Sequence, residues 1–519
     1  MTVRLGKGKV YLVGAGPGDP KLITLRGLEC IRTCDVIVYD RLASPRLLAH
    51  LKPGAERIYV GKLPDRHTMK QEEINRILIE HALEGKIVTR LKGGDPMVFG
   101  RGGEEAEALR REGIEFEIVP GVTSAIAVPA YAGIPVTHRD LASSVSIITG
   151  HENPEKLDEL IRWDRVTNAA GTLVFLMGVA RIGHIARQLI AHGRPPDTKV
   201  ALIRWGTTAD QRTLVGTLAD IEEKVKAARF EPPAVIVVGE VVGKREQLMW
   251  YERRPLFGAR VLVTRARAQA GTLSQKIEEL GGEPVEFPAI ETRMPAGEAA
   301  ASAIGEALRA AESYDHLIFT SVNGVHYFLE WLRRFGLDIR RFHRARVAAV
   351  GPKTAEALRG IGLVPAELPE KYHAEGLLES MRDHVRPGER ALLPRGDLAR
   401  KSLPEALRAL GVEPVEIAVY ETVPAAGGED IVDLLRGGGI HIVTFTSAST
   451  VRHLIGRLQA AGVEHPAGLL AGTAVASIGP LTSAAAREAG LEVAIEPPES
   501  TIDALVAAIA AYWADRRPV

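Results

Sequence analysis

The second half of the sequence contains an internal repeat, which limits its possible folds more than any other feature. RVLVTRARAQAGTLSQKIEELGGEPVEFPAIET, from Arg260, aligns without a gap with RALLPRGDLARKSLPEALRALGVEPVEIAVYET, from Arg390. Two later pairs keep the same order: HLIFTSVNGVHYFL with HIVTFTSASTVRHL, and VAAVGPKTAEALRGIGLVP with VASIGPLTSAAAREAGLEV. A period of about 130 residues has the size of a domain and is too long for a solenoid. We therefore expect two similar α/β domains in this half.

The first half alternates short β-branched runs, such as VIVYD and TLVFLMG, with helical stretches such as MKQEEINRILIEHALEG. This alternation is typical of α/β architecture. A charged and aromatic stretch that contains a proline then predicts a linker between two modules. The expected boundaries are 1–242 for the first module, 243–257 for the linker and 258–519 for the second module, which divides into 258–292 plus 421–519 and 293–420.

The charges of the chain balance, with 65 basic and 65 acidic residues, so no overall field favours nucleic acid or a membrane surface. No apolar run is long enough to cross a bilayer, and the start of the sequence leads directly into an expected strand without a signal peptide. The two cysteines, Cys30 and Cys34, are two ligands short of a structural zinc site. We expect a cytoplasmic protein without a metal.

Residues 14–19, GAGPGD, follow an apolar run and precede a helical stretch, which is the order of a dinucleotide-binding turn. That motif has glycines at its first, third and sixth places, but Asp19 stands at the sixth. A carboxylate at a helix N-terminus would repel the phosphate that the helix should hold. We therefore expect a ligand without a pyrophosphate and disfavour a nicotinamide dehydrogenase.

A series of further motifs in the first half occurs in a specific order. VGAGPGDP, VYDRL and VGK are followed by LKGGDPMVFGRGGEE, PGVTSAIAVPAYAGIPVTHRD, TGH, FLMG and WGTTADQRT. Over about residues 8 to 245 the chain resembles the uroporphyrinogen-III C-methyltransferases, the tetrapyrrole methylases that make precorrin-2. The resemblance implies two α/β domains that hold S-adenosylmethionine and a tetrapyrrole in a cleft between them, and a homodimer formed through this half.

Carried over by motif, the resemblance assigns functional residues. It implies cofactor contacts from Pro17, Gly93, Gly94, Asp95, Val98, Thr123, Ser124, Met177 and Gly206, and it places the acid and base on Asp40 and Lys62. A carboxylate at a strand end can accept the proton that a methylated ring loses. Without the resemblance, Asp40 would be interpreted as a turn cap and Lys62 as a surface amine.

The expected substrate carries eight carboxylates, so we expect a basic cleft around it. Arginine is the better partner for a carboxylate because its planar fork binds both oxygens. The candidates for this cleft, all in or near the motifs, are Arg41, Lys62, Arg66, Arg90, Lys92, Arg101, His138 and Arg139. Among these, Arg41 and Arg101 are the candidate substrate ligands.

Residues 258 to 512 resemble the uroporphyrinogen-III synthases through VLVTR, FTSVNGV, VGPKTAEAL, LLPRG, VYET and SIGPLTSAA. The resemblance implies a duplicated pair of α/β domains that closes hydroxymethylbilane with inversion of its last ring and uses no cofactor. The product of that reaction is the substrate expected for the first half. Neighbouring steps of one pathway in one chain strengthen both assignments.

The repeat indicates an active residue independently, because Tyr420 of AVYET aligns with Ile290 of PAIET. A neutral phenol can donate a hydrogen bond to a departing hydroxyl, and the resemblance places a functional tyrosine at the same position. Four hydroxyl residues in the TS and GPxT turns are candidate ligands for the bilane carboxylates at helix starts, where they are otherwise caps: Ser321, Thr354, Ser447 and Thr482.

We expect a bifunctional enzyme of tetrapyrrole biosynthesis that acts on small molecules, with the pathway to cobalamin or siroheme left open. The alternative is a methylase of a later corrinoid intermediate whose C-terminal half binds tetrapyrrole without catalysis.

Overall fold

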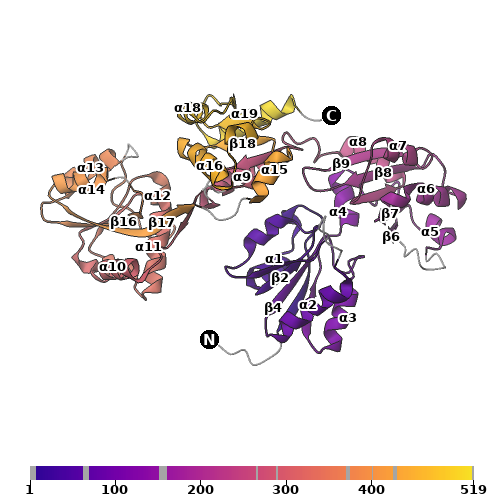
Figure 1. The fold of residues 1–519 in the computed structure, drawn as a ribbon, viewed down its shortest axis with the longest axis horizontal. Coiled ribbons are helices and arrows are strands. Elements are labelled where there is room, and N and C mark those ends of the chain that lie inside the picture. Colours follow the sequence, from indigo (N-terminus) through magenta and orange to yellow (C-terminus); the bar gives the residue numbers. More distant parts are fainter. Residues whose placement is uncertain are drawn as a thin grey trace. The chain divides into compact units, whose positions relative to one another are not determined.

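The computed structural model describes residues 8–61, 69–150, 161–264, 267–287, 290–369, 374–399, 401–424 and 429–516. These residues contain four five-stranded sheets with helices around them (Figure 1). The first of two compact units holds the chain up to Val261, and most of the later residues belong to the second.

The first sheet has the strand order β3-β2-β4-β1-β5, and all its strands are parallel. The strands are β1 (Lys9–Gly14), β2 (Val36–Tyr39), β3 (Glu56–Tyr59), β4 (Ile87–Lys92) and β5 (Glu115–Val119), and the helices are α1 (Leu25–Thr33), α2 (Gln71–Leu83) and α3 (Gly102–Arg111). Strand β2 is buried on both faces: Val36 and Val38 pack in the core with α2 and α3, and Ile37 packs in the core with α1. This is why these strands are nearly continuous apolar runs in the sequence.

The second sheet has the order β6-β7-β10-β8-β9 and mixes parallel and antiparallel pairs. Its strands are β6 (Val145–Thr149), β7 (Thr172–Leu176), β8 (Lys199–Arg204), β9 (Arg212–Thr217) and β10 (Ala234–Val238), and its helices are α4 (Ser124–Tyr131), α5 (Trp163–Ala169), α6 (Ile182–Ala191) and α7 (Ile221–Ala227). Because β7 and β8 both run antiparallel to β10, they run parallel to each other and end at the same edge of the sheet.

The stretch 243–257 is folded against the second sheet and its helices. It includes the end of a 3-10 helix (Glu240–Lys244) and the short helix α8 (Arg245–Leu248). Tyr251 and Leu256 are buried in the first compact unit. An aromatic and charged stretch that resembles a linker in sequence is therefore packed structure here.

The two remaining sheets are built from the repeat. The third has the order β12-β11-β18-β19-β20 and the fourth β13-β17-β16-β14-β15. Their strands are β11 (Arg260–Val263), β12 (Glu283–Glu286), β13 (Ile290–Arg293), β14 (His316–Phe319), β15 (Arg346–Ala349), β16 (Arg390–Gly396), β17 (Glu413–Pro424), β18 (Ile442–Phe445), β19 (Ala474–Ser477) and β20 (Val493–Ile495). The helices are α9 (Arg267–Glu279), α10 (Glu298–Arg309), α11 (Val322–Arg334), α12 (Pro352–Arg359), α13 (Ala374–Met381), α14 (Ser402–Ala409), α15 (Glu429–Arg436), α16 (Ala448–Ala460), α17 (Pro466–Leu469), α18 (Pro480–Glu488) and α19 (Ile502–Ala514).

Each of these sheets combines both copies of the repeat. The third sheet takes β11 from the first copy and β18 and β19 from the second, whereas the fourth takes β16 from the second copy and β14 and β15 from the first. The order β12-β11-β18-β19 therefore corresponds strand by strand to β17-β16-β14-β15. The two domains are similar, as the repeat predicts, but their boundaries do not coincide with those of the repeat.

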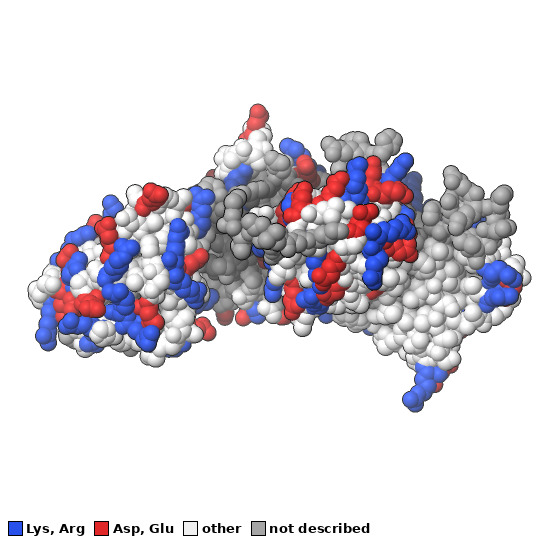
Figure 2. Space-filling model, turned by 90° about the horizontal axis from the view of Figure 1, so that it is seen from below, with Lys and Arg blue, Asp and Glu red and all other residues white. Residues whose placement is uncertain are grey.

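Charged side chains of both signs are interspersed on the face shown in Figure 2, in keeping with the balanced composition. Within the described ranges, no helix is long and apolar enough to cross a membrane.

Candidate active site

A cavity of about 1150 Å³ lies in the first compact unit, where loops from both of its sheets meet. The parallel strands of the first sheet bring Pro17, Asp40 and Gly94 to the cavity, each in the loop after a strand. Strands β7 and β8 end at one edge of the second sheet and bring Met177 and Gly206. Loops at the carboxyl ends of strands are the usual ligand-binding position in α/β folds.

The structure brings most of the predicted cofactor residues together. Seven of them line the cavity: Pro17, Gly93, Gly94, Val98, Ser124, Met177 and Gly206. Asp95 and Thr123 are not in this lining and hold the loops instead. The Asp95 carboxylate accepts hydrogen bonds from the backbone N–H groups of Met97 and Gly121, at 2.8 and 2.9 Å. Thr123 caps α4 by accepting from the N–H of Ala125.

Two of the glycines have a physical reason for their lack of a side chain. Gly94 has φ +70°, and its N–H donates to the carbonyl of Gly16 at 2.7 Å, so it holds the two loops together in a left-handed conformation. A Cβ on Gly206 would lie 2.4 Å from Cγ1 of Val128 in α4. The turn at Gly206 can approach this helix only because the side chain is absent.

Backbone strain is concentrated around the cavity. Six described residues other than glycine have positive φ, and five of them line the cavity: Phe99, Arg101, Met177, Trp205 and Thr207. Such conformations are costly for residues with a Cβ and accumulate at functional sites. Met177 also leaves about half of its apolar side chain exposed.

The loop after β1 has a carboxylate, that of Asp19, at a helix start, where a phosphate group would otherwise bind. Asp19 caps the short helix Pro20–Leu22 by accepting from the N–H of Lys21 at 2.9 Å. Its other carboxylate oxygen accepts from the hydroxyl of Tyr131 at 2.9 Å. Burial and the charge of Asp19 both raise the pKa of Tyr131, so this phenol remains a donor. The Asp19 carboxylate therefore stands at the start of this short helix and accepts hydrogen bonds there.

Asp40 follows β2 directly and lines the cavity, and two hydrogen bonds hold its carboxylate in place. One carboxylate oxygen accepts from the N–H of Leu42 at 3.1 Å, and the other accepts from Nη2 of Arg90 at 3.2 Å. Arg90 also donates to the carbonyls of Val38 and Leu91, so its guanidinium is fixed at the strand ends. The carboxylate of Asp40 is about a quarter exposed and can accept a proton from a molecule in the cavity.

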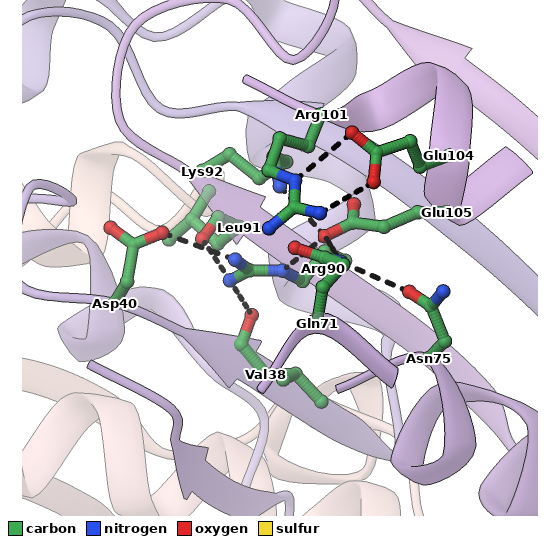
Figure 3. Close-up of polar contacts among 10 residues, drawn as sticks. All are labelled: Val38, Asp40, Gln71, Asn75, Arg90, Leu91, Lys92, Arg101, Glu104 and Glu105. Atoms are coloured by element: carbon green, nitrogen blue, oxygen red, sulfur yellow. Dashed lines mark hydrogen bonds and ion pairs between the residues drawn. The ribbon is translucent and has the colours of Figure 1, made fainter. Parts of the chain in front are cut away.

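Behind Asp40 lies a buried group of charges (Figure 3). Glu105 is fully buried in α3, and it accepts from Nζ of Lys92 at 2.7 Å, from Nε of Arg90 at 3.3 Å and from Gln71 at 3.2 Å. Burial is the main cause that lowers the pKa of Lys92, followed by the charge of Arg90, while Glu105 opposes both. Within the described parts of the chain, nothing donates to the second oxygen of Glu105.

The cations expected in a basic cleft therefore divide into two groups. Arg41, Arg90, Lys92 and Arg101 all line the cavity. Arg41 lies over the ring of Trp205 at 5.5 Å, and the exposed Arg101 pairs with Glu104. Arg90 and Lys92 differ from the other two in being buried, and they pair with Asp40 and Glu105 of the protein. Lys62 and Arg66 lie outside the described residues.

Glu105 is not among the residues expected from the sequence, although the pattern of cations on β4 indicates a buried acid. The two cations of TRLK stand two residues apart on a buried strand, so they point to the same face of the sheet. Two cations on one buried face require an acid opposite them.

In the second compact unit, two of the predicted residues lie together. The hydroxyl of Tyr420, in β17, is 3.4 Å from Oγ of Ser321. Ser321 caps α11 by accepting from the N–H of Gly324 at 3.0 Å. The ring of Tyr420 stacks on Tyr327, and a Cβ on Gly396 would lie 2.7 Å from it. The packing thus fixes the phenol beside a helix start.

The other three hydroxyl residues differ in their surroundings. Ser447 caps α16 by accepting from the N–H of Thr450 at 3.3 Å. Thr354 and Thr482 are the third residues of α12 and α18 and are only 5% and 4% exposed. No group of His, Cys, Asp or Glu suited to a metal ion was found among the described residues.

Two family models match the chain in sequence. Residues 9–222 match the Tetrapyrrole (Corrin/Porphyrin) Methylases, and residues 271–507 match Uroporphyrinogen-III synthase HemD.

Individual relatives match nearly the whole chain or about half of it. The porphyrin biosynthesis protein HemD of Ruminiclostridium josui is 39% identical over 501 residues, which cover 96% of this chain and 97% of the relative. The uroporphyrinogen-III C-methyltransferase of Priestia megaterium is 58% identical over 235 residues, which cover 45% of this chain and 98% of the relative. A crystal structure of uroporphyrin-III C-methyl transferase from Thermus thermophilus, complexed with S-adenyl homocysteine, is 43% identical and covers 46% of this chain and 99% of that chain, with a TM-score of 0.40.

Proposed function

The chain belongs to the family of porphyrin-biosynthesis proteins that join a tetrapyrrole methylase to a uroporphyrinogen-III synthase, and we propose that it carries out two consecutive steps. The second half closes hydroxymethylbilane to uroporphyrinogen III. The first half methylates that product at C2 and C7 with S-adenosylmethionine and yields precorrin-2. We assign the methylase to 1–242 and the synthase to 258–519.

One observation carries the methylase proposal: seven of the nine cofactor residues inferred from scattered motifs line a single cavity, together with Asp40. The space beside Gly94 supports the proposal, because a Cβ added there would meet only backbone atoms of Thr123 and Ser124, the nearer of them at 3.7 Å. When bound there, S-adenosylmethionine supplies an activated methyl group. The apolar side chains of Val98 and Met177, with the backbone at Gly93 and Gly206, are proposed to hold it.

Asp40 is the proposed proton acceptor of the methylase. The methylated ring must lose a proton, and Asp40 presents an acceptor oxygen at the cavity while Arg90 fixes its orientation. Arg41 and Arg101 are the proposed partners of the substrate carboxylates. Lys62 remains the proposed proton donor on the basis of the resemblance alone.

In the synthase half, we assign Tyr420 the role of a donor to the departing hydroxyl of the bilane. The phenol lies beside Ser321 at the start of α11, where backbone N–H groups favour an anion. Ser447, at the corresponding start of α16, is proposed to bind a second side-chain carboxylate. Thr354 and Thr482 are buried at the starts of α12 and α18, so Ser321 and Ser447 are the stronger candidates for substrate contacts.

We further propose a homodimer formed through the methylase half, in a cytoplasmic protein that binds neither nucleic acid nor membrane. The balanced charge supports the absence of nucleic-acid and membrane partners, and the two free, buried cysteines support a reducing compartment. The dimer rests on the resemblance alone. A size measurement in solution tests the dimer.

The decisive experiment supplies hydroxymethylbilane to the purified chain with and without S-adenosylmethionine, and identifies the products by mass and absorbance. We expect uroporphyrinogen III without the methyl donor and its doubly methylated product with the donor. Formation of the type I isomer alone would contradict the synthase assignment. Methylation of a later corrinoid, with none of uroporphyrinogen III, would support the alternative methylase.

A further inference from the structure

The segment 245–257 packs on the residues that form one wall of the cavity. The rings of Trp250 and Tyr251 lie 5.0 and 4.8 Å from the ring of Tyr131, at the end of α4. Nε1 of Trp250 donates to the carbonyl of Ala130 at 3.0 Å, and Arg245 donates to that of Ala132 at 2.5 Å. This segment lies beyond the motifs of the methylase half, yet it is fixed to the helix that supports the cavity.

Glu252 is the polar centre of this packing. Its side chain is 14% exposed. One carboxylate oxygen accepts from Nε2 of Gln211 at 2.7 Å and from the hydroxyl of Thr213 at 2.8 Å, and the other accepts from Arg245. The carboxylate is thus satisfied on both oxygens inside the protein.

Gln211 connects Glu252 to the turn 205–207, which lines the cavity. It is 4% exposed, and its Oε1 accepts from the backbone N–H of Thr207 at 2.8 Å. Thr207 is 2% exposed and has φ +70°, and Trp205 in the same turn has φ +46°. A strained turn needs such outside contacts to keep its conformation.

The remaining polar groups of Thr207 are held as well. Its carbonyl accepts from the hydroxyl of Tyr251 at 3.4 Å, and its Oγ1 accepts from the N–H of Asp19 at 3.0 Å. Two of the three contacts of Thr207 therefore connect it to the segment 245–257, one through Gln211 and one through Tyr251. The third connects it to Asp19, in the glycine loop after β1.

The direction of this chain of hydrogen bonds is fixed by the charge of Glu252. A carboxylate can only accept, so the NH₂ group of Gln211 must face Glu252 and its oxygen must face the N–H of Thr207. A neutral amide at position 252 would reverse this order. Its oxygen would face Arg245, its NH₂ group would face Gln211, and a flipped Gln211 would leave the buried N–H of Thr207 without an acceptor.

We propose that Glu252 is a positioning residue for the turn 205–207, and that the segment 245–257 is in this way part of the cofactor site. The inference rests on the proposed binding of S-adenosylmethionine at Gly206. Glu252 does not itself line the cavity, so it acts through Gln211.

The test measures binding of S-adenosylhomocysteine to the full chain by calorimetry, which separates the dissociation constant from the fraction of competent sites. Glu252→Gln should raise the dissociation constant about tenfold or more, because it leaves one buried donor unpaired. It should also raise the KM for S-adenosylmethionine and largely retain kcat at saturation. A purely structural role would instead lower the fraction of competent sites at an unchanged dissociation constant.

A second substitution should restore the hydrogen bonds in the reverse direction. In the double variant Gln211→Glu with Glu252→Gln, the new carboxylate accepts from the N–H of Thr207 and from the new amide, whose oxygen still faces Arg245. Gln211→Glu alone places two carboxylates against each other and should also weaken binding. The double variant should therefore bind more tightly than either single variant.

Glu246→Gln is the matched control, since Glu246 is an exposed acid in the same segment. Bilane closure by the same chain should be unchanged in every variant. Equal dissociation constants for Glu252→Gln and Glu246→Gln would overturn the positioning role and leave the proposed function intact. A double variant weaker than both single variants would also overturn it. An unmodified chain that binds no S-adenosylhomocysteine would overturn the proposed function and this inference together.

Discussion

Replacing Glu105 by glutamine should destabilise the first compact unit strongly, because two buried cations depend on it. Lys92 and Arg90 are 5% and 4% exposed and donate to the same carboxylate oxygen, at 2.7 and 3.3 Å. Glutamine has almost the same shape and keeps one acceptor, but it removes the charge that balances Lys92. In Figure 3, Glu104 lies next to Glu105 and pairs with Arg101 instead.

The size of the effect follows from the burial of each pair. Removing one partner of a buried ion pair costs about 3–5 kcal/mol, and the retained acceptor favours the lower end of this range. For a unit of this size, about 3 kcal/mol corresponds to a fall in Tm of roughly 6–12 °C. Glu104→Gln is the control, because the side chains of Glu104 and Arg101 are 54% and 53% exposed and such pairs contribute about 1 kcal/mol or less.

Calorimetry of thermal unfolding of the full chain measures the difference in Tm between Glu105→Gln and Glu104→Gln. The charge-balanced double variant Lys92→Met with Glu105→Gln should recover part of the lost Tm, because it leaves no unpaired ammonium in the core. A Glu105→Gln chain that melts with the parent would refute the argument. So would a double variant that melts below the single variant, because the unpaired cation would then not be the cause.

Three further predictions test the proposed sites. Asp40→Asn should lower methylation turnover and leave calorimetric binding of S-adenosylhomocysteine largely intact, since proton loss follows methyl transfer. Tyr420→Phe should slow bilane closure about tenfold to a hundredfold, the equivalent of about 1–3 kcal/mol, and chromatography should show more of the type I isomer. Gly206→Ala should weaken cofactor binding in the same calorimetric assay, and adding Val128→Ala should restore part of it, because the new Cβ would lie 2.4 Å from Cγ1 of Val128.

Each of these predictions has a result that contradicts it. An equal loss of cofactor binding and turnover in Asp40→Asn would remove its role in proton transfer. If Tyr420→Phe forms the type III isomer at the parent rate, the Tyr420 side chain serves only in packing against Tyr327. A Gly206→Ala chain that Val128→Ala does not improve would show that contact with the helix is not what excludes a side chain there.

The sequence predicts the cavity well because motif residues at strand ends converge in any parallel sheet. Asp40 and Gly94 follow β2 and β4, so the topology alone brings them to one edge. Glu252 could not be found in this way, because its role depends on a contact with Gln211 across 41 positions. The neighbouring residues Trp250 and Tyr251, in a stretch that resembles an exposed linker by composition, pack on the ring of Tyr131.

The repeat predicts similar domains, and the expected boundaries have the chain cross between them at 292/293 and 420/421, but they do not predict the course of the strands there. Tyr420 and Ile290 align in sequence, which suggests equivalent positions in two separate sheets. In the structure, β17 is one strand of 12 residues, whereas its counterpart in the first copy is divided into β12 and β13. Strand β13 joins the fourth sheet, where Arg293 pairs antiparallel with Glu421.

In the second copy, the continuous strand β17 carries Tyr420 to a fixed place beside Ser321, where its ring stacks on Tyr327. In the first copy, β12 ends at Glu286 in the third sheet and β13 begins at Ile290 in the fourth. The place of the proposed phenol donor therefore depends on the path of the backbone as well as on the residue type, and the aligned motifs PAIET and AVYET do not reveal that path.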